Sequence, residues 1–245
     1  MVRLNALTKK FGAFTAVDAL SFAVEPGSIF AFLGTNGAGK TTTIRMITGA
    51  LRPTSGSVEI GGFDIQKEPL RAKGLLAVIP DRPFIYGKLT GREFLQFIAD
   101  LYRVKHSLAA KRIDELIESY GLGQWQHELV EAYSHGNKQR LMLCAALVHE
   151  PAIMVLDEPT VGLDPLGARL LKETFRERAA RGLTIFLSTH SLALAEEVAH
   201  KIAVIHRGKL VAIGTLVELY KQFETAPDLE ALFMRIVEER EQPAP

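Results

Sequence analysis

The chain has 245 residues, 29 Lys and Arg against 28 Asp and Glu, and a hydrophobic content of 47%. This length allows one large α/β domain or one domain with an inserted subdomain. The near-neutral charge gives no support for direct nucleic-acid binding. The single cysteine, Cys144, excludes an internal disulfide and a multi-cysteine metal site.

The sequence contains no recognisable membrane-spanning or export signal. No stretch approaches the roughly 20 apolar residues that cross a bilayer, and the first residues lack the apolar centre of a signal peptide. We therefore expect a cytoplasmic protein that reaches the membrane only through a partner. Cys144 lies in an apolar run, where we expect it to be buried.

The first part of the chain, to about Gly62, is predicted to be rich in β-strands. Short runs of alternating or continuous apolar residues, bounded by Gly or Pro, are typical of strands. We expect such strands at residues 2–7, 21–24, 29–33 and 57–60, followed by an apolar segment at 75–79 that Pro80 stops.

From about residue 84 to 150 the apolar residues recur at helical spacing, with Phe94, Phe97 and Leu101 on one face. We interpret this as a helical insertion between two halves of a parallel sheet. Strands and helices then alternate, as in crossover units. We expect strands at 152–156, 184–187, 202–205 and 209–213, a terminal helix at 228–240, and a frayed end at 242–245.

Residues 34–42 fit the pattern G-x-x-x-x-G-K-[ST], between an apolar strand and a short helix that Gly49 closes. Glycines let backbone N–H groups converge on phosphate oxygens, and the helix dipole favours the same anion. Lys40 adds a charge for the outer phosphates, and Thr41 offers a hydroxyl to Mg²⁺. The sequence therefore predicts a phosphate-binding loop made of Gly34, Thr35, Asn36, Gly37, Ala38, Gly39, Lys40, Thr41 and Thr42.

Acidic and imidazole side chains follow two other predicted strands. Asp157 and Glu158 end one strand, and His190 follows another. Ligands bind at the carboxyl ends of strands in open parallel sheets. We expect Asp157 to reach Mg²⁺, Glu158 to act as general base for an attacking water, and His190 to bond the γ-phosphate.

A third candidate lies about twenty residues before Asp157. Ser134 has the character of a helix N-cap, and Gly136 lies in the first turn that follows. This is a second helix N-terminus suited to an anion, although an ordinary capped helix has the same pattern.

Together these motifs resemble, in order, those of the ATP-binding subunits of ABC transporters, over roughly residues 2 to 215. Residues 34–42 resemble Walker A, 133–137 the signature motif, 153–158 Walker B with its glutamate, 162–165 the D-loop, and His190 the switch histidine. The resemblance implies an α/β fold of the P-loop NTPase type, with a parallel-sheet core, an N-terminal antiparallel β region and an inserted helical subdomain. It also implies an ATPase that uses ATP and Mg²⁺.

The resemblance further implies site residues and partners. Phe11 stands where the family stacks an aromatic ring on adenine, and Val17 is expected to add an apolar contact to the base. In the family, the signature motif of one protomer covers the ATP of the other, which gives Ser134, Gly136 and Asn137 a nucleotide-binding role. We therefore expect a homodimer or a homologous ATPase partner, in a system most similar to bacterial exporters. We expect a transmembrane permease to dock at residues 84–89, although a loop that packs on the core has the same pattern.

The implied domain division places an ATP-binding domain at 1–220, with the helical subdomain at 84–150, and a C-terminal helix and tail at 221–245. Two departures from the family pattern stand out. Asp81 replaces the usual glutamine, which keeps a magnesium ligand but adds negative charge beside Asp157 and Glu158. His135 and Asn137 replace the usual first glycine and terminal glutamine of the signature.

Alternatives stay open at this stage. A soluble ABC-type ATPase that acts on DNA or ribosomes usually needs a long coiled-coil insertion or tandem domains, for which 245 residues leave little room. A non-hydrolysing regulatory module is disfavoured by Glu158 and His190 but is kept open by Asp81. GTP specificity is disfavoured, because Arg140 stands where guanine recognition would want an aspartate after Asn137 and Lys138.

Overall fold

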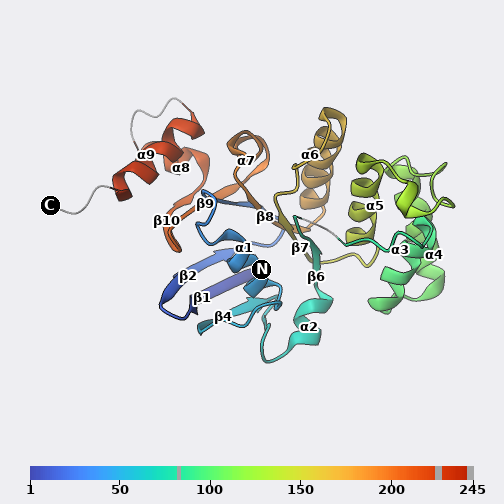
Figure 1. Cartoon of the computed structure of the whole chain (residues 1–245), viewed down its shortest axis with the longest axis horizontal. Helices are drawn as coiled ribbons and strands as arrows, with labels where there is room; N and C mark the ends of the chain where they lie inside the picture. The colour runs from blue at the N-terminus through green and yellow to red at the C-terminus, as the bar shows by residue number, and fades with distance from the viewer. Residues whose placement is uncertain (82–83, 224–227, 242–245) are drawn as a thin grey trace.

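The computed structural model describes residues 1–81, 84–223 and 228–241 (Figure 1). Two sheets make up its β structure. A four-stranded sheet has the order β2-β1-β4-β5, and a six-stranded sheet has the order β10-β9-β3-β8-β7-β6. The predicted fold class, a parallel-sheet core with an antiparallel N-terminal region and an inserted group of helices, is confirmed.

The four-stranded sheet is antiparallel and holds most of the N-terminal region. Its strands are β1 Val2–Phe11, β2 Phe14–Val24, β4 Ser55–Ile60 and β5 Phe63–Asp64. β1 continues past residue 7, where we predicted its end. The pairing of β1 with β2 shifts register between Leu4 and Lys10, and Ala6 and Ala19 have positive φ angles of 44° and 49°. These bulges interrupt the alternation of apolar and polar residues, so the pattern underestimates the length of the strand.

The six-stranded sheet is parallel except for its edge strand β10. Its strands are β3 Ile29–Leu33, β6 Leu76–Ile79, β7 Ile153–Asp157, β8 Thr184–Thr189, β9 Lys201–His206 and β10 Lys209–Gly214. Every residue of β3, β7 and β8 is buried, which explains why their sequences are mostly apolar, with polar residues at the ends of β7 and β8. Leu33 pairs with Thr189, and Asp157 pairs with Ser188. The segments that follow these strands therefore meet at one edge of the sheet.

Two hydrophobic clusters cover the two faces of this sheet. Alternate residues of β3 belong to different clusters, with Ala31 in one and Phe30 and Phe32 in the other. The helices beside the sheets are α1 Lys40–Ile47, α2 Pro69–Gly74, α6 Pro165–Ala180, α7 Leu192–Val198 and α8 Leu216–Gln222.

The helical insertion lies between β6 and β7 in the chain and to the right of the sheets in Figure 1. It contains α3 Gly91–Leu101, α4 His106–Ser119, the 3-10 turn η1 Val130–Ala132 and α5 His135–Leu147. Thr90 and Glu93 form a capping box at the start of α3. Cys144 is fully buried on α5, as predicted, and this burial raises the pKa of its thiol.

The C-terminal helix α9, Leu229–Glu241, lies at the opposite end of the molecule from α3 and α4 (Figure 1). Leu229, Leu232 and Ile236 are buried in the same cluster as Leu194 of α7 and Leu219 of α8. The predicted frayed end, 242–245, lies outside the described residues. No helix in the described part of the chain combines the length and the apolar character that crossing a bilayer requires.

Candidate active site

The predicted phosphate loop connects β3 to α1 at the edge where the parallel strands end. Gly37 and Gly39 have positive φ angles of 80° and 109°, which an L side chain adopts only with strain. Gly39 is the N-cap of α1 and brings no side-chain cap, so the N–H groups of the first turn need another acceptor. A cavity of about 870 Å³ opens beside the loop. This volume suits a nucleotide-sized ligand.

Lys40 is 7% exposed and is held inside the loop by backbone oxygens. Its Nζ donates to the carbonyl oxygens of Gly34 at 2.6 Å and Thr35 at 3.4 Å. The same ammonium lies 3.6 Å from Glu158 Oε1. A buried ammonium needs such partners. Because Lys40 lines the cavity, its positive charge would attract an anion that binds there.

Thr41 and Asp157 place two oxygen atoms that can bind a metal ion next to each other at the cavity wall. The Thr41 hydroxyl donates to Asp157 Oδ2 over 3.1 Å, and Ser188 donates to the other carboxylate oxygen. Mg²⁺ prefers such oxygen ligands and usually takes one or two from the protein, with phosphates and waters completing its shell. The described residues contain no group of three or more His, Cys, Asp or Glu side chains that could hold a metal alone. Thr41 and Asp157 fit a magnesium ion whose other ligands are phosphate oxygens and waters.

Glu158 follows Asp157 in a strained conformation, with a φ angle of 49°. Its N–H donates to Ser188 O at 3.0 Å, which ties it to the neighbouring strand β8. Its carboxylate lies 2.9 Å from His190 Nδ1 and accepts a hydrogen bond from the His190 backbone N–H at 3.2 Å. The structure therefore brings Lys40, Thr41, Asp157, Glu158 and His190, all predicted from sequence, to one cavity.

The β1–β2 hairpin forms another wall of this cavity. Phe11, Phe14 and Ala16 line it, and both aromatic rings are largely exposed. Val17 is fully buried, and its Cγ2 packs beneath Gly39 rather than on the cavity wall. The prediction that Val17 contacts a base directly is therefore not supported, because strand alternation turns its neighbour Ala16 to the cavity instead.

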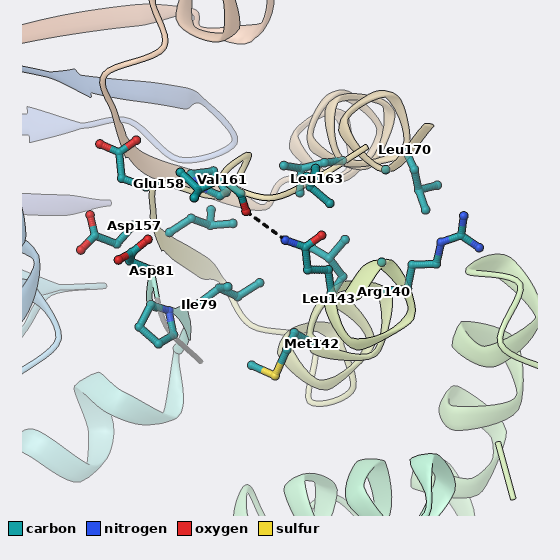
Figure 2. Close-up of a pocket in the computed structure, with 17 residues that line it drawn as sticks. Ile79, Asp81, Arg140, Met142, Leu143, Asp157, Glu158, Val161, Leu163 and Leu170 are labelled. Carbon is teal, nitrogen blue, oxygen red and sulfur yellow. Dashed lines mark hydrogen bonds between the residues drawn. The ribbon is translucent and has the colours of Figure 1, made fainter. Parts of the chain in front are cut away.

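Asp81 lines the large cavity together with Asp157 and Glu158. It also lines a second cavity of about 50 Å³ between α5 and the segment after β7. Figure 2 shows these three carboxylates at one end of the second cavity and Arg140 and Leu170 at the other. Gln139 crosses it, donating from Nε2 to Val161 O at 3.3 Å.

The predicted signature residues lie at the start of α5. Ser134 is its N-cap, as predicted, with the side chain accepting from Asn137 N–H at 3.3 Å. None of Ser134, Gly136 and Asn137 lines the large cavity within this chain. The His135 ring instead packs against Gly162, where an added Cβ would lie 2.8 Å from it. Within this chain the predicted signature residues are therefore separate from the groups that line the large cavity.

Some wall residues were not predicted from sequence, and some predicted residues do not form the wall. Phe14, Ala16 and Arg45 line the cavity, whereas Gly34 and Ala38 lie behind it. The exposed aromatic position of Phe14, three residues after Phe11, was the available signal. Ala38 packs in the core beneath the loop, and its carbonyl oxygen accepts a hydrogen bond from Gly208 N–H at 2.9 Å.

Comparison with known proteins gives an independent view of the chain. Residues 17–161 match the family model described as ABC transporter. The chain is 36% identical over 219 residues to the linearmycin resistance ATP-binding protein LnrL of Bacillus subtilis (strain 168), covering 89% of this chain and 70% of the relative. It is 41% identical over 215 residues to the bacitracin transport ATP-binding protein BcrA of Bacillus licheniformis, covering 86% of this chain and 68% of the relative.

Solved structures agree with these relatives. One described as the structure of the ATP-binding subunit of an ABC transporter superposes with a TM-score of 0.90 and is 32% identical. The alignment covers 96% of this chain and 99% of the other.

Proposed function

The chain belongs to the ABC transporter family, as an ATP-hydrolysing subunit that energises transport through a separate membrane protein, and from this premise we propose how its residues bind and split ATP. The observation that carries the proposal is the single cavity that collects Lys40, Thr41, Asp157, Glu158 and His190. These groups supply a cation for phosphate, oxygen donors for a metal, and a carboxylate beside an imidazole.

The phosphate loop binds the triphosphate. Backbone N–H groups at the start of α1 and the Lys40 ammonium meet the phosphate oxygens, and Lys40 exchanges its bonds to Gly34 O and Thr35 O for them. Phe11 and Phe14 offer exposed rings on which the base stacks. Thr41 and Asp157, with Asp81 nearby, hold Mg²⁺. When bound, the ion neutralises charge on the phosphates.

Glu158 is the general base in this proposal. Its carboxylate is largely buried, and His190 and Lys40 hold it from two sides. A carboxylate so oriented accepts a proton from water. The largely exposed His190 ring would exchange its contact with Glu158 for one with a γ-phosphate.

A second protomer completes the site. The N-cap of α5 lies outside the cavity of its own chain, as described above, and a helix N-terminus is suited to the phosphates of a partner's nucleotide. Val161, on the segment after Glu158, and Leu166, in the first turn of α6, expose apolar side chains. We therefore assign this surface to a face-to-face pair of copies or to a homologous ATPase.

The membrane subunit docks on an aromatic cluster formed by Phe84, Tyr86 and Phe97. Their rings meet edge to face, with centroids 5.2 Å and 5.4 Å apart, and all three are exposed. An exposed apolar patch of this kind indicates a protein partner. Relatives are named for resistance to linearmycin and transport of bacitracin, so the proposed cargo is an antibiotic-like compound that the membrane subunit exports. The ATPase itself is placed in the cytoplasm, bound to that subunit at the inner face of the membrane.

The proposal is tested with purified chain and Mg²⁺–ATP. Wild type should hydrolyse ATP and dimerise with nucleotide, as measured by phosphate release and light scattering. Leu166→Glu should bind ATP normally, because Leu166 does not line the cavity, but should stay monomeric and lose turnover. Leu70→Glu is the matched control, since Leu70 is equally apolar and even more exposed on α2. Absence of ATP hydrolysis by the wild type, with or without its membrane subunit, would overturn the proposal.

A further inference from the structure

The tight turn between β9 and β10 lies directly behind the phosphate loop. His206 pairs with Lys209, which leaves Arg207 and Gly208 as a two-residue hairpin loop. Both have positive φ angles, 46° and 79°. This is the conformation of a type I′ turn, which glycine at the second position favours. The turn belongs to a strand pair that the nucleotide site does not use.

Gly208 joins two walls of the large cavity through its backbone. Its N–H donates to Ala38 O, in the phosphate loop, at 2.9 Å. Its own carbonyl oxygen accepts from the N–H of Asp18, in β2, at 2.8 Å. β2 also carries Ala16, which lines the cavity beside Phe11 and Phe14. One residue therefore connects the phosphate side of the cavity to the aromatic side.

The bond to Ala38 O fixes the direction of a neighbouring donor. No cis peptide bond occurs in the described chain, so the Ala38–Gly39 peptide is trans. In a planar trans peptide the C=O and N–H point in opposite directions. Because the Ala38 carbonyl points at Gly208, the Gly39 N–H points away from it, and Gly39 lines the cavity. The turn thus orients the Gly39 N–H toward the cavity, where it can donate to a phosphate.

The three backbones pack too closely for a side chain at this position. A Cβ added to Gly208 would lie 2.8 Å from Ala16 O and 3.3 Å from Val17 Cα. A Cβ added to Gly39 would lie 2.6 Å from the same Ala16 oxygen. These obstacles are backbone atoms of a paired strand, so they cannot rotate away as a flexible side chain would. Any side chain at 208 must move the turn away from β2 or from the loop.

We propose that Gly208 is a positioning residue for the nucleotide site, which it serves without touching the ligand. Its backbone holds Ala38 O and Asp18 N–H at a set separation, and so sets the phosphate loop relative to the aromatic wall. The inference rests on the proposed binding of ATP in this cavity. It assigns a role in nucleotide affinity to a turn outside every motif of the site.

The chain offers a matched control in the turn between β4 and β5. Gly61 and Gly62 form a two-residue loop in which Ile60 pairs with Phe63, and their φ angles are 59° and 89°. Gly62 thus has the same turn position as Gly208. An added Cβ at Gly62 meets no heavy atom of the described chain within 4 Å. Gly62→Ala therefore carries the strain of a positive φ without the steric contact.

The test compares wild type, Gly62→Ala and Gly208→Ala by thermal unfolding and by equilibrium binding of a fluorescent ADP with Mg²⁺. We expect both variants to lose some thermal stability, Gly62→Ala to keep the wild-type Kd, and Gly208→Ala to raise it at least tenfold. Equal Kd values for the two folded variants would overturn the inference. Failure of wild type to bind nucleotide would instead remove the proposed function on which it rests.

Hydrogen exchange on the wild type keeps the test decisive if Gly208→Ala does not fold. The Gly208 amide donates to the phosphate loop, so saturating Mg²⁺–ADP should slow its exchange severalfold. The Gly62 amide, on a turn outside the cavity, should exchange at an unchanged rate. An unchanged exchange rate of the Gly208 amide with bound nucleotide would refute the proposed link between this turn and the nucleotide site.

Discussion

His190 contacts Glu158 twice, once through its ring and once through its backbone. The ring Nδ1 lies 2.9 Å from Oε2 of the glutamate, and the His190 N–H donates to the same oxygen at 3.2 Å. Glu158 follows β7 and His190 follows β8, and these strands pair in parallel up to Asp157 and Ser188. The position of the carboxylate thus depends on the sheet as well as on the imidazole.

Replacing Glu158 by Gln should separate binding from hydrolysis. The amide fills the same space but cannot take a proton from water, so kcat should fall by about 10² or more, while the Kd for Mg²⁺–ATP stays within about threefold of wild type. Steady-state phosphate release and equilibrium binding measure the two quantities. Glu173→Gln, an exposed change on α6, is the control. Undiminished turnover in Glu158→Gln would remove the residue from its proposed role.

The Thr41 hydroxyl is predicted to couple nucleotide affinity to magnesium. Thr41→Ala removes one of the two proposed oxygen ligands of Mg²⁺, the Thr41 hydroxyl, which lies 3.1 Å from Asp157 Oδ2. The gain in ATP affinity on adding Mg²⁺ should therefore shrink about tenfold. Ser119→Ala is the comparison, because that hydroxyl donates to Glu115 O within α4 and does not line the large cavity. Titrations of ATP binding with and without EDTA report the gain. An identical gain in Thr41→Ala and wild type would contradict the ligand assignment.

Asp81 should weaken binding of metal-free ATP. It adds a third carboxylate to a cavity wall that already holds Asp157 and Glu158, and like charges repel the triphosphate when no cation screens them. Asp81→Gln should therefore bind ATP about three- to tenfold more tightly in EDTA, by roughly 1 kcal/mol, with a smaller change in excess Mg²⁺. Calorimetry in both buffers measures the Kd for ATP, and Asp100→Asn, at an exposed position of α3, is the control. Tighter metal-free binding by wild type than by Asp81→Gln would reverse the electrostatic argument.

Much of the fold was predictable because buried strands and amphipathic helices have different spacings of apolar residues. β3, β7 and β8 are buried throughout, so their sequences are continuous apolar runs ended by the functional residues. The far end of β1 and the short strand β5 were not predicted. Local bulges disturb the alternation in β1, and two residues carry too little pattern to define β5.

The site, like the fold, has residues that the sequence predicts and residues that it does not. Lys40, Asp157, Glu158 and His190 follow strands of one sheet, and the topology of a parallel sheet brings such positions together. Ala16 and Gly208 act through backbone contacts between segments almost 200 residues apart in the chain, and nothing in their local sequence indicates these contacts. Val17 was expected at the base but does not line the cavity, and the bulges of the β1–β2 pair obscure from sequence which residue of β2 faces it.

His149 is the basis of a predicted pH dependence of folding stability. Its ring stacks on Tyr102 with 3.6 Å between centroids, and its Nε2 lies 3.1 Å from Leu76 O, where the Tyr102 hydroxyl also donates. Burial lowers the pKa of His149 below the usual 6.5, nearby Arg112 lowers it further, and the bond to Leu76 O opposes both. In the described chain its Nδ1 has no hydrogen-bond partner, so a second proton would gain no acceptor.

The sign of the effect follows from proton binding. The unfolded chain takes up a proton on His149 near pH 6.5, whereas the folded chain resists it. The contribution to stability is therefore complete above that pH and is lost progressively as the pH falls from there toward the lower pKa of the folded chain. His149→Gln keeps a donor for Leu76 O but does not titrate. Urea unfolding from pH 7.5 to 5.5 should show a shallower decline for His149→Gln than for wild type or for His106→Gln, whose site is exposed at the start of α4. Parallel declines in all three proteins would show that His149 titrates alike in the folded and unfolded chain, and the burial argument would fail.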